Sequence, residues 1–304
     1  MNVGVIGCNG FVGKHLCLTM SKNKSINLKL FGKSDFNLTK LNLPYIKIDV
    51  SNKEETIKEI KDLDLIYYLA SASIPVTSWE NPKIEIEQNL LPFLNFLECV
   101  SLSNIKKVVF ISSAGTVYGS SNEKLNEKTN KLPFSPYGIN KLTMEYYLNY
   151  YQKKNNLNYD IFRVSNIYGE NQDTSKGLGI INTFLENIIH KKNINIFGNG
   201  ETIRNYIYIK DVISFLLTSL ETELQQSNIY NLSSNDNLSI NELLNIIDSI
   251  VKEEYKVQYM EQRNSDNPFI SLDNSKIKSM FPSIQFTSIF GGIKSCYDFL
   301  KKEV

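Results

Sequence analysis

The sequence predicts an α/β protein built on a doubly wound parallel sheet, followed by a smaller C-terminal α/β region. The apolar run 2–6 ends in a glycine-rich turn that leads into a helical stretch, as expected of a buried parallel strand. Short apolar strands and amphipathic helical stretches then alternate through residues 1–165, and several strands end in small residues. This alternation is typical of a parallel sheet with helices on both faces.

Length and composition describe an ordinary globular chain. The 304 residues carry a net charge of +1, so no general attraction to nucleic acid or to a membrane is expected. The four cysteines lack metal-ligand or redox spacing, and the presence of only two histidines argues against zinc and a Ser-His-Asp triad. Met1 leads directly into the first strand, and no apolar run approaches the ~18 residues of a membrane span. We expect a cytoplasmic protein with reduced thiols and no metal.

The first strand is followed by a glycine triplet, Gly7, Gly10 and Gly13. Glycines with this spacing let the backbone pass close to a pyrophosphate held at the N-terminus of the next helix, which runs through Met20. A strand before the turn and a helix after it favour nucleotide binding over a plain tight turn.

The second strand, 26–31, ends where a dinucleotide-binding sheet contacts the adenosine ribose. NAD-binding proteins carry an acidic residue here, but this chain has Gly32, Lys33 and Ser34. A cation and a hydroxyl without a carboxylate suit a ribose 2′-phosphate, so the sequence favours NADP. The alternative is an exposed turn in which Asp35 supplies the acid.

Later strands also end in small or polar residues, which can line a ligand site at the carboxyl edge of a parallel sheet without filling it. A helix near residues 89–100 lies between the last two of them. These strand ends are Asp49-Val50, Leu69-Ala70-Ser71 and the segment 112–119.

Tyr137 and Lys141 stand four residues apart in a predicted helix, so their side chains share one face. Ser135 and Pro136 have the residue types of an N-cap and a first helical residue, which places the pair in the opening turns. A tyrosine hydroxyl titrates near ~10 and is a poor base at neutral pH. A lysine ammonium beside it, with a cationic nicotinamide nearby, would lower that pKa toward the working range.

Beyond residue 165 the alternation loosens. We expect a dinucleotide-binding domain at 1–165, with about 204–222 returning to it, and a second region formed by 166–203 and 223–304. Asp211 is expected to cap the returning helix. Ser239 and Glu242 have the spacing of a capping box.

These motifs, in this order, resemble the extended short-chain dehydrogenase/reductase family, and within it the branch of nucleotide-sugar epimerases, dehydratases and reductases. The resemblance covers nearly the whole chain and implies a Rossmann sheet with a nucleotide-sugar-binding second region. The matching positions are Gly7, Gly10, Gly13, Asp49, Val50, Ala70, Asn89, 112–119, Tyr137, Lys141, 163–169, 198–212 and 263–266.

The resemblance implies a role for each matching position. Tyr137 would be the acid/base on a sugar hydroxyl or carbonyl, and Lys141 would also grip the nicotinamide ribose. Asn166 would face the substrate, while Arg204 and Arg263 would clamp its diphosphate, because guanidinium groups suit phosphate oxygens. The residues expected to contact the cofactor are Gly7, Asn9, Gly10, Phe11, Val12, Gly13, Gly32, Lys33, Ser34, Asp49, Val50, Leu69, Ala70, Ser71, Asn89, Ser112, Tyr137 and Lys141.

The chain departs from the family pattern at several places. A Ser or Thr commonly stands four residues before the tyrosine of the Tyr-Gly dipeptide, but here that position is Ala114. Either Ser113 or Thr116 must then supply the hydroxyl that polarises the substrate oxygen. The Thr-Asp-Glu run of 4,6-dehydratases is absent, which argues against elimination chemistry, and the acid at Gly32 is missing.

The predicted reaction is hydride transfer between a nicotinamide and C4 of the hexose in a nucleoside-diphosphate sugar. We place first an NADPH-dependent reductase of a 4-keto-6-deoxyhexose, because of Lys33 and its neighbours. The alternative is a UDP-hexose 4-epimerase, of the UDP-glucose/UDP-galactose type, that retains NAD. A third interpretation is a noncatalytic cofactor sensor, against which the intact Tyr137 and Lys141 argue. The family commonly dimerises through the helices near 89–100 and 137–154, and we expect a homodimer.

Overall fold

The computed structural model describes residues 1–35, 43–121, 123–175, 177–261 and 270–303. The chain packs as two compact units, each made of three segments. The functional domain limits expected from the sequence stay a prediction. Unit 1 comprises Met1–Val117, Pro133–Arg163 and Ile213–Tyr230, and unit 2 comprises Tyr118–Leu132, Val164–Val212 and Asn231–Val304.

Unit 1 is built on a seven-stranded sheet. Its strands are β1 (Asn2–Ile6), β2 (Asn27–Gly32), β3 (Tyr45–Lys47), β4 (Leu65–Tyr68), β5 (Lys107–Ser113), β6 (Asn158–Val164) and β10 (Asn228–Leu232). Their order is β10-β6-β5-β4-β1-β2-β3, and the pairs joining β5 through β3 are parallel. The chain starts at β1, adds β2 and β3 on one side, and then crosses back to build the other side from β4. This reversal confirms the predicted doubly wound sheet. The topological switch point lies between the neighbouring central strands β1 and β4.

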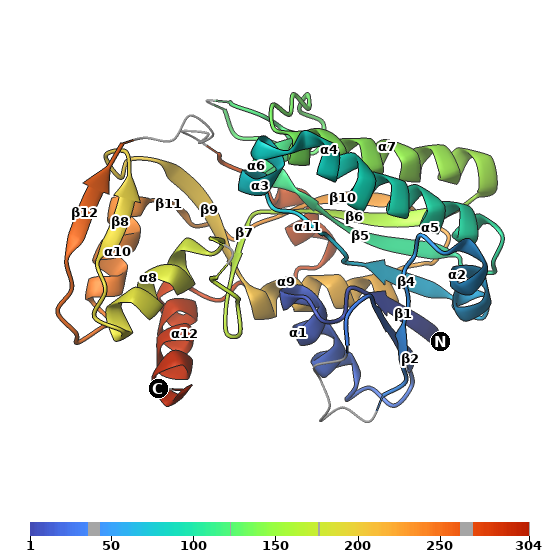
Figure 1. Ribbon diagram of the computed structural model, residues 1–304, viewed down its shortest axis with the longest axis horizontal. Helices are drawn as coiled ribbons and strands as arrows, with labels where there is room; N and C mark the ends of the chain where they lie inside the picture. The colour runs from blue at the N-terminus through green and yellow to red at the C-terminus, as the bar shows by residue number, and fades with distance from the viewer. Residues whose placement is uncertain (36–42, 122, 176, 262–269, 304) are drawn as a thin grey trace. The chain divides into compact units, whose positions relative to one another are not determined.

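Helices cover both faces of this sheet, as Figure 1 shows. The helices are α1 (Phe11–Met20), α2 (Lys53–Ile60), α3 (Pro75–Glu80), α4 (Pro82–Glu85), the π-helix η1 (Ile86–Leu90), α5 (Leu91–Ser101), α6 (Ala114–Val117), α7 (Pro136–Asn155), α9 (Ile209–Leu217) and the 3₁₀ helix η2 (Thr218–Leu220). In the view of Figure 1, α5 and α7 lie above the sheet, and α1 lies below it. The C-terminal part of α9 belongs to unit 1, where Tyr67 Oη donates to the Leu216 carbonyl at 2.9 Å.

The main core of unit 1 lies between the sheet, α5 and α7. The Tyr68 ring lies 4.9 Å from the Phe93 ring and 4.8 Å from the Phe96 ring, between centroids. Phe110 of β5 and Leu148 of α7 are fully buried in the same cluster. Because aromatic side chains bury large areas, this layer fixes α7 firmly against β5.

Unit 2 holds two smaller sheets, and their orders are β11-β9-β7 and β12-β8. Its strands are β7 (Asn166–Tyr168), β8 (Ile194–Phe197), β9 (Ile203–Tyr208), β11 (Asn237–Ser239) and β12 (Val257–Met260). Its helices include α8 (Ile180–Ile189), α10 (Ile240–Asp248), α11 (Ser275–Met280) and α12 (Ile289–Glu303).

Of the two helix caps predicted in this part of the chain, one is confirmed and one is wrong. Ser239 N donates to Glu242 Oε2 at 2.8 Å and Glu242 N donates to Ser239 Oγ at 3.1 Å, which is the predicted capping box. Asp211 does not cap α9, because that helix already begins at Ile209. Its carboxylate instead accepts from the N–H and the hydroxyl of Thr287, at 2.8 and 2.7 Å.

No helix within the described ranges is both long and apolar enough to cross a membrane. That part of the chain also brings together no group of three or more His, Cys, Asp or Glu side chains that could hold a metal ion. The four cysteines are buried free thiols.

Candidate active site

The glycine turn between β1 and α1 follows a backbone path that side chains would block. Gly7 has a φ of +88°, and a Cβ there would lie 2.7 Å from Ala70 N. A Cβ on Gly13 would lie 2.2 Å from Gly7 O, because the first turn of α1 packs on the glycine turn itself. Gly10 is the N-cap of α1, and no side chain in the described part of the chain caps this helix. The N–H groups of Phe11, Val12 and Gly13 can therefore face an anionic group such as a pyrophosphate.

Among the described residues, four charged side chains lie around the turn after β2, where the sequence predicts contact with the ribose. Lys33 Nζ lies 2.8 Å from Asp49 Oδ2, and Lys47 Nζ lies 2.7 Å from Asp35 Oδ1. Hydrogen bonds from these lysines hold the pKa of each carboxyl below its ordinary value. Lys33, which the sequence analysis assigns to a 2′-phosphate, thus has a carboxylate partner in the protein.

Asn9 and Tyr45 hold this turn in place. Asn9 Nδ2 donates to Ser34 Oγ at 3.1 Å and to the Asp35 carbonyl at 3.0 Å. The Tyr45 hydroxyl donates to the Gly32 carbonyl at 3.1 Å and also to the Ser34 carbonyl. A Cβ on Gly32 would lie 2.9 Å from Tyr45 Oη. The glycine turn and the turn after β2 are therefore joined directly through Asn9 and Ser34.

Asn89 fixes the loop that follows β4. It lies in the π-helix η1, a geometry that is rare overall and frequent at functional sites. Its Oδ1 accepts from Ala72 N at 2.8 Å, and its Nδ2 donates to Ser73 Oγ at 2.8 Å. Because Ala70 also lies against Gly7, the loop after β4 and the glycine turn form one surface.

Three other predicted cofactor contacts lie at neighbouring strand ends. Leu69 N continues the β1–β4 ladder by donating to Ile6 O at 2.9 Å. The Val50 carbonyl accepts from Asn95 Nδ2 of α5. Ser112 Oγ is buried near the end of β5 and has no hydrogen-bond partner among the described residues.

The tyrosine–lysine pair lies in the first two turns of α7. The predicted cap is confirmed, because Ser135 Oγ accepts from Gly138 N at 3.1 Å and Pro136 is the first helical residue. Lys141 Nζ donates to the Ile111 carbonyl of β5 at 3.1 Å and lies 5.6 Å from the centroid of the Tyr137 ring. The ammonium group is thus anchored to the sheet beside the tyrosine.

Burial and nearby carboxylates set the electrostatics of the tyrosine–lysine pair. Burial, and then the charge of Glu85, raise the pKa of Tyr137 to about 12, although a hydrogen bond with the Ser71 side chain lowers it. Burial lowers the pKa of Lys141 to about 8, and Glu85 and Glu145 oppose that shift. From the sequence, Lys141 and a cationic nicotinamide together are expected to lower the pKa of Tyr137, and that stays a prediction. In the protein by itself, desolvation and a nearby carboxylate set the direction of the shift.

Ser113 and Thr116, the two candidates for the polarising hydroxyl, lie close to each other. Ser113 ends β5 and Thr116 lies in α6, where its Oγ1 donates to the Ser113 carbonyl at 3.3 Å. A Cβ on Gly138 would lie 2.5 Å from Thr116 O, so α6 packs directly on the start of α7. Both residues therefore lie close to the start of α7, and the choice between their hydroxyls stays open.

Besides Ser113 and Thr116 of unit 1, the residues predicted to bind substrate include Asn166 and Arg204, which belong to unit 2. In the β11-β9-β7 sheet Asn166 stands opposite Tyr206, and Arg204 lies two residues before Tyr206. The three side chains therefore share one face of the sheet. Asn166 Nδ2 donates to the Asn205 carbonyl at 2.9 Å, and Arg204 Nη1 donates to the Ile203 carbonyl at 3.0 Å. Arg263 lies outside the described residues.

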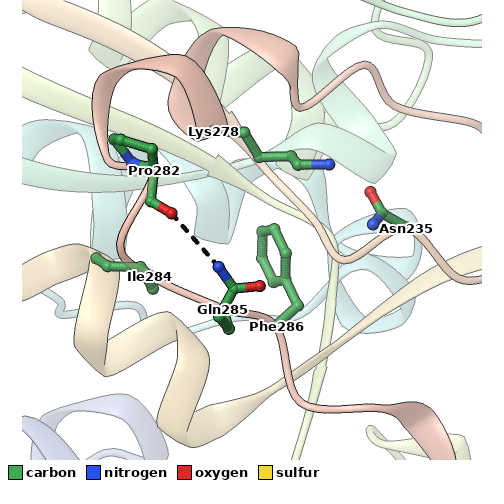
Figure 2. Close-up of a pocket in the computed structure, with 6 residues that line it drawn as sticks. All are labelled: Asn235, Lys278, Pro282, Ile284, Gln285 and Phe286. Atoms are coloured by element: carbon green, nitrogen blue, oxygen red, sulfur yellow. Dashed lines mark hydrogen bonds between the residues drawn. The ribbon is translucent and has the colours of Figure 1, made fainter.

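Unit 2 also contains a pocket of about 300 Å³, in which none of the predicted site residues takes part. Figure 2 shows the Phe286 ring near the side chains of Lys278 and Asn235, and Gln285 Nε2 donating to the Pro282 carbonyl, at 3.4 Å. The charged and polar groups around this pocket are half-buried or exposed, which is typical of a surface hollow.

Sequence reasoning missed two buried residues next to the tyrosine–lysine pair, Glu85 and Asn140. Glu85 lies in a stretch that alternates charged and apolar residues and looks like a solvent-facing helix. The available signal was its spacing of four from Asn89, which places both side chains on one helical face.

The chain is similar to known proteins over most of its length. A model of the NAD dependent epimerase/dehydratase family matches residues 3–233. A putative UDP-glucose 4-epimerase from Methanocaldococcus jannaschii is 30% identical over 280 residues, covering 91% of each chain. A dTDP-4-dehydro-6-deoxyglucose reductase from Escherichia coli is 29% identical over 279 residues, covering 88% of each chain.

The fold is shared with a solved structure. The UDP-glucose 4-epimerase of Thermotoga maritima, crystallised with UDP-glucose, superposes with a TM-score of 0.93 at 25% identity, covering 100% of this chain and 99% of that one. The similar proteins thus include both an epimerase and a reductase of nucleotide sugars.

Proposed function

This chain belongs to the NAD dependent epimerase/dehydratase family, and we propose that it is a 4-epimerase of a nucleoside-diphosphate hexose that retains NAD. Its relatives include epimerases and a reductase that act on nucleotide sugars. The observation that carries the choice of epimerase is the charge pattern after β2.

Two carboxylates next to that turn, those of Asp35 and Asp49, favour NAD over NADP. A 2′-phosphate would have to displace Asp49 from Lys33 and would meet the negative charge of Asp35 close by. Ribose hydroxyls, in contrast, can donate to carboxylate oxygens. Exposed ion pairs contribute only ~0–1 kcal/mol, so this pattern sets a preference between the two cofactors and does not forbid either.

The residues of unit 1 fit the chemistry of C4 oxidation and reduction. Bound NAD, which the glycine turn and Lys141 would hold, would supply a reversible acceptor for the hydride of C4. Tyr137 takes the proton of the C4 hydroxyl during oxidation and gives it back during reduction, so the protein ends each cycle unchanged. Lys141 holds positive charge beside the tyrosine, and Ser113 or Thr116 donates to the C4 oxygen as its charge develops.

An NADPH-dependent reductase of a 4-keto-6-deoxyhexose nucleotide is the second candidate. Gly32 leaves the usual acid position without a carboxylate, and the Escherichia coli reductase is 29% identical. A Tyr137 pKa of about 12 also suits a proton donor, because the hydroxyl stays protonated at neutral pH.

We also propose a homodimer, formed through α5 and α7. Ile139, Tyr146 and Tyr150 are 51%, 63% and 49% exposed, and their spacing places them on one face of α7. Leu91 at the start of α5 is 54% exposed. Large apolar side chains on two adjacent helices are typical of a subunit interface.

The nucleotide that copurifies with the protein and the net cofactor balance distinguish the two candidates. Purified protein is denatured and the released nucleotide is identified, and intact protein is then incubated with UDP-glucose, UDP-galactose and dTDP-4-keto-6-deoxyglucose. The epimerase proposal expects released NAD and interconversion of two hexose epimers without net cofactor consumption. Stoichiometric oxidation of NADPH with the keto sugar, and no epimerisation, would establish the reductase instead.

A further inference from the structure

Glu85 is a buried carboxylate beside the tyrosine–lysine pair, and it is only 2% exposed. Two other buried carboxylates of unit 1 have cationic partners. Asp160 lies 3.2 Å from Lys107, and Glu145 lies 2.6 Å from Arg163. Glu85 makes no ion pair within the described ranges. Burying a carboxylate without a cation costs free energy of folding, which suggests that Glu85 is kept for a functional reason.

The partners of Glu85 are two asparagine amides. Asn140 Nδ2 donates to the Glu85 carbonyl at 2.8 Å and to Oε2 at 3.4 Å, and Asn89 Nδ2 donates to Oε2 at 3.2 Å. Oε1 is buried and has no partner in the described part of the chain. Asn140 immediately precedes Lys141, and Asn89 holds the loop after β4. Glu85 therefore joins the two segments that carry Lys141 and Ser71.

The charge of Glu85 acts on both members of the pair. It raises the pKa of Tyr137 because it opposes a phenolate, and it raises the pKa of Lys141 because it favours an ammonium. Glu145, on α7 itself, raises the pKa of Lys141 only and is bound to Arg163 of β6. Among the described residues, Glu85 of α4 is thus the one charged group that acts on both side chains.

We propose that Glu85 is a positioning residue, which orients the tyrosine–lysine pair through Asn89 and Asn140 and sets the pH range in which that pair exchanges a proton with the sugar oxygen. The inference rests on the proposed role of Tyr137 in proton transfer at the sugar oxygen. The inference about Glu85 holds for either direction of hydride transfer. Tyr137 acts as a base in one direction and as an acid in the other, and the ionisation of its hydroxyl governs both.

The substitution Glu85→Gln keeps the shape of the side chain and removes its charge. The pKa that governs turnover should then move down by about one unit, since the phenolate loses a nearby negative charge. This corresponds to an about tenfold change in rate at a fixed pH on the titrating limb. For an epimerase the acidic limb of the profile moves to lower pH, and for a reductase the alkaline limb does so. The measurement is turnover against pH with saturating substrate and cofactor.

Two further variants separate charge from packing. Glu85→Asp keeps the charge, so its profile should stay within a few tenths of a pH unit of the wild type even if its melting temperature falls. Glu87→Gln is the matched control, because Glu87 lies two residues further on, where it pairs with Lys83 at 3.2 Å on the surface. Its pH profile and turnover should match those of the wild type.

Each variant can overturn the inference by itself. If Glu85→Gln has the same pH profile of turnover as the wild type, Glu85 has only a packing role. If only Glu85→Asp folds, a one-unit shift of its pH profile would lead to the same conclusion, because that variant keeps the charge. Tyr137→Phe is measured in parallel. If Tyr137→Phe is inactive while Glu85→Gln keeps the wild-type profile, only the inference about Glu85 fails. If Tyr137→Phe is fully active, the proposed function itself fails.

Discussion

Among single residues, Lys141 titrates close to the physiological range. Burial lowers its pKa to about 8, while Glu85 and Glu145 raise it. The ammonium form is therefore present at neutral pH and is lost as the pH rises through that value. Its hydrogen bond to the Ile111 carbonyl keeps this titrating group at a fixed distance from Tyr137.

The hydroxyl of Tyr137 is expected to be the proton carrier. Tyr137→Phe removes this hydroxyl and nothing else, so turnover should fall by ~10²–10⁴-fold, the usual contribution of a general acid or base. Cofactor affinity, measured by fluorescence titration, should stay close to that of the wild type. Tyr146→Phe, on the exposed face of the same helix, is the control and should retain full activity. Wild-type turnover in Tyr137→Phe would rule out the assignment.

Asp49 is expected to limit the affinity for NADP, because its carboxylate forms an ion pair with Lys33. Asp49→Asn should release the lysine for a 2′-phosphate and shift the NADP/NAD preference toward NADP. A charge-assisted contact is worth ~1.5–3 kcal/mol, or about 10- to 100-fold in the ratio of dissociation constants. Calorimetric titration with each dinucleotide measures that ratio. In the double variant Asp49→Asn/Lys33→Ala the gain should disappear, and its persistence would mean that Lys33 plays no part.

Among the structural elements, the glycine turn is one that tolerates little change. A Cβ on Gly13 would lie 2.2 Å from Gly7 O, so Gly13→Ala should push α1 away from the turn. We expect a loss of ~1–3 kcal/mol in unfolding free energy, as for other overpacked sites, and loss of measurable NAD binding. Gly10→Ala is the milder comparison, since its Cβ would lie 3.3 Å from the same oxygen. Equal stability and NAD affinity in Gly13→Ala and the wild type would contradict the close packing.

The sequence predicts those elements whose signals are local, and it fails where the partners are distant. The glycine turn, the cap at Ser135 and the alternation of strands and helices all depend on residues within a few positions of each other. The pairing of Lys33 with Asp49 brings together the ends of two separate strands, which composition does not reveal. The contact between Glu85 and Asn140 likewise depends on how α4 packs on α7, and the residues of the π-helix that carries Asn89 do not distinguish it from an ordinary helix.

For the whole molecule, the exposed apolar face of α7 predicts an oligomer. Tyr146→Glu places a charge in the middle of the proposed interface and should convert a dimer into a monomer, as measured by sedimentation velocity at micromolar protein. Met280→Glu changes an exposed apolar residue of unit 2 and should leave the dimer intact. A wild type that sediments as a monomer would remove the proposed interface.

The buried Lys107–Asp160 pair also bears on how the protein is made. Lys107 Nζ donates to Thr222 Oγ1 at 3.2 Å and to the Glu223 carbonyl at 2.8 Å, and β10 forms the edge of the sheet next to β6. On the ribosome, β5 and β6 are synthesised long before these partners, so the nascent chain holds a sheet with an unprotected edge and an incompletely satisfied interior charge. Such intermediates are prone to aggregation. We therefore expect unit 1 to close only after β10 has been translated, and we expect the nascent sheet to be most prone to aggregation before that point.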